Sequence, residues 1–200
     1  MRAGVVAGVA AVALMAAGCS LVTPVAEPVV PTFPATTTTA APPPAPVKAG
    51  LPKNCNDLIE GKQLDDAVGL PLSGVVRTVI GQPSPSVGLI GRVSCSFGIP
   101  SPSGGYALEL SLTSYRDEEA AAARVPINVE ALRTPGVDPL PIKIGRMTAM
   151  YLPLRDGPML IGSTGIYSIT VILGPTSFSP DEAPARAAAV AGMALSGVRA

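Results

Sequence analysis

The sequence predicts an α+β fold: an antiparallel sheet of about five strands with helices packed on one face, preceded by a disordered linker. Short segments in which apolar and polar residues alternate, as in half-buried strands, recur between residues 75 and 173. Helical segments come before, between and after them, an order that favours an antiparallel sheet with packed helices. Residues 19–52 are dense in proline, and their apolar residues follow neither the period of a strand nor that of a helix.

The composition excludes several classes of function. The chain has 200 residues, with 14 basic and 14 acidic side chains. This balance provides no basic surface for nucleic acid. The sequence has no histidine, which is the commonest metal ligand and the side chain whose pKa lies nearest neutrality. We therefore expect no nucleic-acid partner, no metal, no cofactor and no enzymatic activity.

Residues 1–18 have the features of an export signal. Arg2 supplies a positive charge, and the segment from Ala3 to Met15 is apolar and uncharged. Small residues, Ala16 to Gly18, follow at the expected cleavage site. The apolar run is shorter than the roughly 20 residues that a membrane-spanning helix needs. We therefore predict a cleaved signal peptide rather than a transmembrane helix.

Residues 15–19, Met-Ala-Ala-Gly-Cys, resemble a bacterial lipobox, with Ala16 at the position that is usually Leu. The resemblance implies that Cys19 becomes the first residue of the mature chain and carries a lipid. Two or three acyl chains anchor a protein stably, because each buried CH₂ contributes about 0.8 kcal/mol. The implied location is the cell envelope, at the outer face of the cytoplasmic membrane, with the membrane as a partner through Cys19.

Residues 19–52 form the predicted linker, and residues 53–200 form a single exported domain. The many prolines of the linker favour an extended, polyproline-like chain that spans roughly 3 Å per residue. The run Thr36–Thr39 beside prolines is typical of an O-glycosylated stalk. An unmodified linker fits the same residues equally well.

Cys55 and Cys95 are the two cysteines that remain once Cys19 is lipidated. An even pair in an exported protein indicates a disulfide. A redox or nucleophilic role would need a second cysteine of a Cys-x-x-Cys motif or a histidine base, and the sequence has neither. We therefore predict a structural Cys55–Cys95 bridge.

The first half of the domain is predicted to hold one helix and three strands. Asn56 and Asp57 can cap a helix that Gly69 ends, and its apolar face would comprise Leu64, Ala67 and Val68. Residues 75–80 (VVRTVI), 93–99 (VSCSFGI) and 106–115 (YALELSLTSY) are the predicted strands, and the last two can form a hairpin. The predicted inward residues are Val93, Cys95, Phe97, Ile99, Tyr106, Leu108, Leu110 and Leu112.

The second half is predicted to hold two helices and three strands. Residues 116–125 form an acidic-to-alanine helix that Pro126 ends or kinks. Residues 144–154, 159–163 and 166–173 are strand candidates. The last helix begins at the capping box of Ser179 or at Asp181, and its apolar stripe would comprise Val190, Met193, Ala194 and Val198.

These motifs together resemble small lipoproteins of actinobacteria that share an uncharacterised exported domain. The resemblance covers roughly residues 55–198 and depends on short segments, namely Cys55-Asn-Asp-Leu, Ala67-Val-Gly69, Cys95-Ser96-Phe97 and SYRDEEAAAARV. Phe97 stands where the commonest form has Trp. The resemblance supports the fold and the cysteine bridge, and it implies no catalytic residues.

No catalytic motif stands out. Ser163 in IGSTGI lacks the G-x-S-x-G spacing of a hydrolase, and a turn between two strands fits this segment better. Three acidic groups, Asp65-Asp66, Asp117-Glu118-Glu119 and Asp181-Glu182, lie at helix starts or on helix surfaces, where carboxylates are expected. Two interpretations, the lining of a pocket for an acyl chain or core filling, are open for the methionines Met147, Met150, Met159 and Met193. A binding patch or ordinary strand positions are open for the tyrosines Tyr106, Tyr115, Tyr151 and Tyr167.

The sequence thus favours a membrane-anchored envelope lipoprotein whose domain is a non-enzymatic binding or interaction module for an envelope protein partner. The alternative is a carrier or sensor of a lipid or another small apolar ligand. A hydrolase that acts on cell-wall material is a third hypothesis. A continuous apolar cavity of several hundred Å³ would favour the carrier over the protein-binding module.

Overall fold

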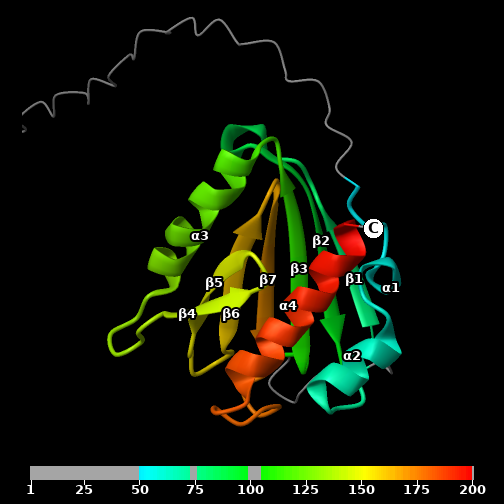
Figure 1. Ribbon diagram of the computed structural model, residues 1–200, viewed down its shortest axis with the longest axis vertical. Helices are drawn as coiled ribbons and strands as arrows, with labels where there is room; N and C mark the ends of the chain where they lie inside the picture. Colours follow the sequence, from blue (N-terminus) through cyan, green and yellow to red (C-terminus); the bar gives the residue numbers. More distant parts are fainter. Residues whose placement is uncertain (1–49, 73–75, 99–104, 200) are drawn as a thin grey trace, which may run out of the picture. The chain divides into compact units, whose positions relative to one another are not determined.

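Seven antiparallel strands form one sheet in the computed structural model, which describes residues 50–72, 76–98 and 105–199 (Figure 1). All of these residues belong to one compact unit by their contacts. The predicted signal peptide, Cys19 and Thr36–Thr39 lie outside the described residues. No helix within the described ranges combines the length and the apolar character needed to cross a membrane.

The spatial order of the strands is β1-β2-β3-β7-β6-β5-β4. Their bounds are β1 Val76–Gly81, β2 Leu89–Phe97, β3 Leu108–Tyr115, β4 Leu140–Ile144, β5 Met147–Leu152, β6 Met159–Thr164 and β7 Tyr167–Leu173. The α+β class is confirmed, but the prediction of about five strands was too low. The segment predicted as one strand from Ile144 is instead the end of β4, a turn at Gly145 with φ 57°, and β5.

Four α-helices accompany the sheet: α1 Cys55–Leu58, α2 Gly61–Val68, α3 Glu118–Leu132 and α4 Ala183–Arg199, with a short 3₁₀ turn at Pro85–Val87. The predicted first helix is therefore two helices, and the cap of α1 is Asn54, whose side chain accepts a hydrogen bond from the backbone N–H of Asp57. Gly69 ends α2 as predicted, with φ 72°. Pro126 does not end α3, which continues to Leu132.

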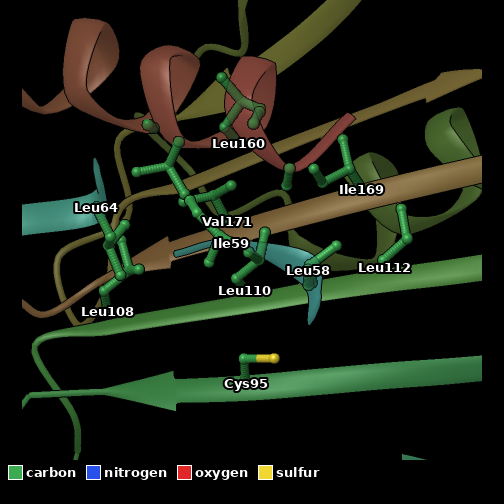
Figure 2. Close-up of a cluster of buried hydrophobic side chains, with 14 of the residues drawn as sticks. Leu58, Ile59, Leu64, Cys95, Leu108, Leu110, Leu112, Leu160, Ile169 and Val171 are labelled. Carbon is green, nitrogen blue, oxygen red and sulfur yellow. The ribbon is translucent and has the colours of Figure 1, made fainter. Parts of the chain in front are cut away.

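One face of the sheet, the core face, is buried under α1, α2 and α4. A row of paired residues crosses it from β2 to β5: Cys95, Leu110, Val171, Leu160 and Tyr151. The helices contribute Leu64, Val190 and Ala194 to the same cluster, and all of these side chains are fully or almost fully buried (Figure 2). The stripe predicted for α4 is thus confirmed at its centre, while Met193 and Val198 pack partly against the core.

The other face of the sheet, the groove face, carries the alternate residues of the same strands, and α3 packs over it. Successive strand residues point to opposite faces, so Ser111, Thr170 and Ile161 lie opposite the core row. Asn128 and Leu132 of α3 line a groove together with these three residues. The prediction that all helices pack on one face was therefore wrong: α3 lies on the face opposite α4.

Candidate functional site

The groove between α3 and the groove face is the candidate site. Its volume is about 400 Å³. The lining residues come from α3 and from strands β2, β3, β6 and β7: Arg92, Ser111, Thr113, Tyr115, Asn128, Ala131, Leu132, Met159, Ile161, Ser168, Thr170 and Ile172. A volume in this range suits a small organic ligand.

Polar and apolar residues occupy different sides of this groove. On the β2–β3 side, Arg92 pairs with Thr113, and Thr113 pairs with Ser168 of β7. On the β6 side, Met159 pairs with Ile172. Adjacent strands lie about 4.8 Å apart, so three strand spacings, roughly 14 Å, separate β2 from β6. Ile172 also lies four residues beyond Ser168 in β7, so the polar and apolar ends of the groove are separated along the strands as well as across them.

A second hollow of about 420 Å³ extends the apolar side. It shares Leu132, Met159 and Ile172 with the groove. Arg155 and Asp156, from the turn between β5 and β6, also line it, and their charges are opposite. The apolar end of the site thus continues beyond the groove itself.

The groove exists because small side chains face each other across it. From α3 the groove is lined by Asn128, Ala131 and Leu132, whereas Ala121 near the start of the helix is its only fully buried residue. Of the six residues of β3 and β7 that line the groove, four are Ser or Thr. Side chains of this size cannot fill the space between a helix and a sheet, whereas interiors are normally close-packed. The amphipathic pattern that normally reveals a packed helix face is consequently weak in α3.

Arg92 is held at the polar end of the groove by its neighbours on both sides. Its Nε donates a hydrogen bond to Oγ1 of Thr113 at 3.1 Å. On the other side it pairs with Gly81 of β1. A Cβ at Gly81 would lie only 3.0 Å from the Cβ of Arg92, so the glycine leaves room for the arginine stem. Arg92 is exposed, and its Nε–H points toward Thr113 of β3.

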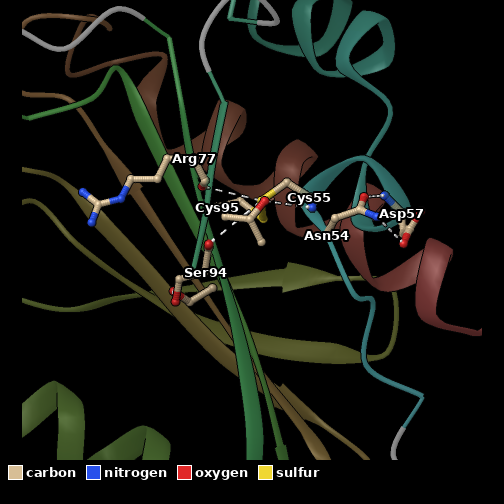
Figure 3. Close-up of a disulfide and its surroundings, with 8 residues drawn as sticks. Asn54, Cys55, Asp57, Arg77, Ser94 and Cys95 are labelled. Carbon is tan, nitrogen blue, oxygen red and sulfur yellow. Dashed lines mark hydrogen bonds between the residues drawn. A yellow bond between two sulfur atoms is a disulfide. The ribbon is translucent and has the colours of Figure 1, made fainter. Parts of the chain in front are cut away.

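The predicted Cys55–Cys95 disulfide is present, and it lies on the core face, away from the groove (Figure 3). Its Cα atoms are 5.6 Å apart, and both residues are at most 1 % exposed. The hydroxyl of Thr78 donates a hydrogen bond to the Cys55 sulfur at 3.0 Å. The bridge ties α1 to β2, and its burial fits a structural role.

The acidic groups considered in the sequence analysis serve local structure. Asp65 accepts a hydrogen bond from the backbone N–H of Leu72 at 2.7 Å. Asp117 caps α3 by accepting from the N–H of Ala120, and this bond together with Arg116 holds the pKa of Asp117 below its usual value. Glu182 accepts a hydrogen bond from the Ser179 hydroxyl. The described residues contain no group of three or more acidic or cysteine side chains that could hold a metal ion.

Ser163 lies near the end of β6, close to the tight turn at Gly165 that leads to β7, as the turn interpretation predicted. Of the methionines and tyrosines for which the sequence left two interpretations, Met159 and Tyr115 line the groove. Met147 and Tyr151 are buried in the core instead, and burial raises the pKa of Tyr151. The sequence analysis did not single out Arg92 or the Ser and Thr residues of the groove, because alternating polar residues normally face solvent.

No family model matches this chain, and no curated protein is similar to it. Among solved structures, the chain is similar to the extracellular domain of PknH from Mycobacterium tuberculosis. The two share 8% sequence identity with a TM-score of 0.46, and the match covers 74% of this chain and 97% of the other. Our proposals for this chain therefore rest on its own residues.

Proposed function

We propose that this chain is a lipid-anchored protein of the cell envelope whose domain binds a small amphipathic molecule in the groove under α3. The observation that carries the proposal is the groove itself, about 400 Å³ with polar and apolar sides. The groove has the volume expected for the carrier or sensor, but it is partly polar rather than a continuous apolar cavity, so we propose an amphipathic ligand in place of an apolar one. The groove therefore favours a small ligand over a protein partner.

The proposed role is binding rather than catalysis. The lining residues offer hydroxyl groups, one amide and one guanidinium. A serine or threonine hydroxyl becomes a nucleophile when a base activates it, and the sequence has no histidine to do so. Hydroxyl and amide groups of this kind fix the orientation of a ligand in a pocket.

Anchoring through Cys19 is the second part of the proposal, and it predicts the effect of Cys19→Ala. We expect this variant to lose all metabolic labelling with palmitate and to leave the membrane fraction, because the thiol that receives the lipid is gone. Labelled palmitate fed to cells that express each form would measure this. The Cys55→Ala/Cys95→Ala double variant is the matched control, since neither cysteine is the predicted lipid acceptor, and its labelling per molecule of protein should equal that of the unmodified chain. Undiminished labelling of the Cys19→Ala form would contradict the anchor.

Filling the groove should prevent binding. Ala131 lines the groove from α3, so a Trp side chain at this position would occupy the ligand volume. The probe is decanol with a photoactivatable diazirine in its alkyl chain. We expect Ala131→Trp to reduce labelling of the groove by this probe at least tenfold. The full chain in lipid nanodiscs would be irradiated with the probe, and labelled peptides would be mapped by mass spectrometry.

Ala122→Trp is the matched control for this experiment. Positions 122 and 131 are nine residues apart on α3, which at 100° per residue places them on opposite sides of the helix. Ala122 is exposed and does not line the groove. Equal labelling of both variants and the unmodified chain, or labelling spread evenly over the surface, would rule out the groove as a ligand site.

A further inference from the structure

We infer that the ligand is an anionic amphiphile, with a carboxylate or phosphate head at Arg92 and a single alkyl chain along the β6 side of the groove. This inference rests on the proposed function and specifies the chemical class of its ligand. Arg92 is the only charged residue among those that line the groove. In the adjoining hollow the charges of Arg155 and Asp156 sum to zero, so the net charge of the lining comes from Arg92 and favours an anionic head group.

The guanidinium of Arg92 has hydrogen-bonding capacity to spare. An arginine side chain carries five N–H donors, and Nε alone is used for Thr113. Among the described residues, the salt bridges involve Lys62, Arg116, Arg133 and Arg186, and Arg92 takes part in none. The two terminal nitrogens are therefore available to bind a carboxylate or phosphate in the bidentate geometry that arginine favours.

Hydroxyl groups line the groove from the Arg92 side to β7. Thr113 lies beside Arg92 in the next strand, and Ser168 follows in the same row on β7. The side chains of Ser111 and Thr170, which are paired with each other in the adjacent row, also line the groove. Hydroxyl donors can complete the hydrogen bonds of an anion whose remaining oxygens face away from the arginine.

The opposite side of the groove suits an alkyl chain. Ile161, Met159 and Ile172 on the sheet and Leu132 on α3 form a continuous apolar lining that extends into the adjoining hollow. Methionine adapts to flexible apolar ligands. Three strand spacings, roughly 14 Å, separate β2 from β6, and the row of Met159 and Ile172 lies four residues, roughly 13 Å, further along the strands than the row of Arg92. The diagonal from Arg92 to Met159 is therefore roughly 19 Å, part of which the long Arg92 side chain spans. One molecule of medium chain length can therefore reach both ends.

The test uses three diazirine probes with the same alkyl chain and different heads: decanoate, decyl phosphate and decanol. The full chain in lipid nanodiscs would be titrated with each probe, and the half-saturating concentration for labelling groove peptides would be measured. Each probe is compared between protein variants, because its partition into the nanodisc lipid is the same for all of them. We expect Arg92→Gln to raise the half-saturating concentration of an anionic probe about tenfold and to leave that of decanol unchanged.

Arg77→Gln is the matched control, since Arg77 lies on the same face of the sheet in β1 and does not line the groove. Arg77→Gln removes the same charge and should leave the half-saturating concentration of all three probes unchanged. The anionic probe with the larger response to Arg92→Gln identifies the head as carboxylate or phosphate. The inference would be overturned if Arg92→Gln and Arg77→Gln changed the half-saturating concentration of the anionic probes equally, or if neither variant changed it. Labelling of the groove by decanol would still support the proposed function in that case. Failure of every probe to label the groove would reject both.

Discussion

Removal of the Cys55–Cys95 disulfide is expected to lower the free energy of unfolding by about 4 kcal/mol. The bridge closes a loop across a sequence separation of 40, and cross-linking a loop of this length removes that much entropy from the unfolded chain in the chain-entropy model. For a domain of this size the loss corresponds to a decrease of about 10–15 °C in Tm. The double variant Cys55→Ala/Cys95→Ala, in which neither thiol is left unpaired, would be compared with the unmodified chain by thermal denaturation.

Reduction of the unmodified chain provides the control for this prediction. Reduced protein and the double variant should melt at similar temperatures, because both lack the cross-link while their core packing differs only by two buried sulfur atoms. The bridge lies on the core face, so ligand labelling of the groove should persist below the lowered Tm. Free thiols at both positions in the exported protein, or an unchanged Tm, would contradict a stabilising bridge.

The features that could be predicted from the sequence are those in which burial leaves a pattern. On β3, Leu108, Leu110 and Leu112 alternate with polar residues, and all three are fully buried on the core face. On α4, Val190 and Ala194 lie on one stripe at helical spacing, and both are buried against the sheet. Each pattern arises because the strand or helix has a single apolar face, and that face packs against the hydrophobic core.

No such pattern shows which face of the sheet α3 covers. This is why the sequence analysis placed it on the same face as the other helices. Alanine is small and common on both buried and exposed helix faces, so the run from Ala120 to Ala123 does not mark the side that meets the sheet. The Ser and Thr residues of β3 and β7 similarly fit either solvent or a lined groove. The candidate site is therefore made of residues that are individually unremarkable and become a site only through the sheet register.

Strand β4 was missed for a different physical reason. Its sequence, LPIKI, contains Pro141 and Lys143, and proline cannot donate a ladder hydrogen bond, which argues against a central strand. The structure places β4 at the edge of the sheet, paired only with β5, where a proline and a lysine are tolerated and discourage further strand addition. Proline in a short alternating segment thus indicated an edge strand rather than a loop.

Substitution of Leu110 by Ala is expected to destabilise the domain by about 3 kcal/mol. Leu110 is fully buried at the centre of the sheet, where it pairs with Cys95 on one side and Val171 on the other. Leu→Ala at such a position removes buried apolar area and leaves a cavity that the neighbouring strands cannot close, which costs roughly 2–5 kcal/mol. Urea denaturation of the unmodified and variant chains would measure the difference.

Leu140→Ala is the matched control, because it makes the same chemical change on the edge strand β4, where Leu140 is 49 % exposed. We expect a cost of about 0.5 kcal/mol or less there. Leu110 and the groove residue Ser111 are neighbours in β3 that face opposite sides of the sheet, so Leu110→Ala should lower stability without changing groove labelling of the folded protein. Ala131→Trp should do the reverse. Equal costs for the two leucine variants would contradict the assignment of the core face, and with it the separation of packing on one side of the sheet from ligand binding on the other.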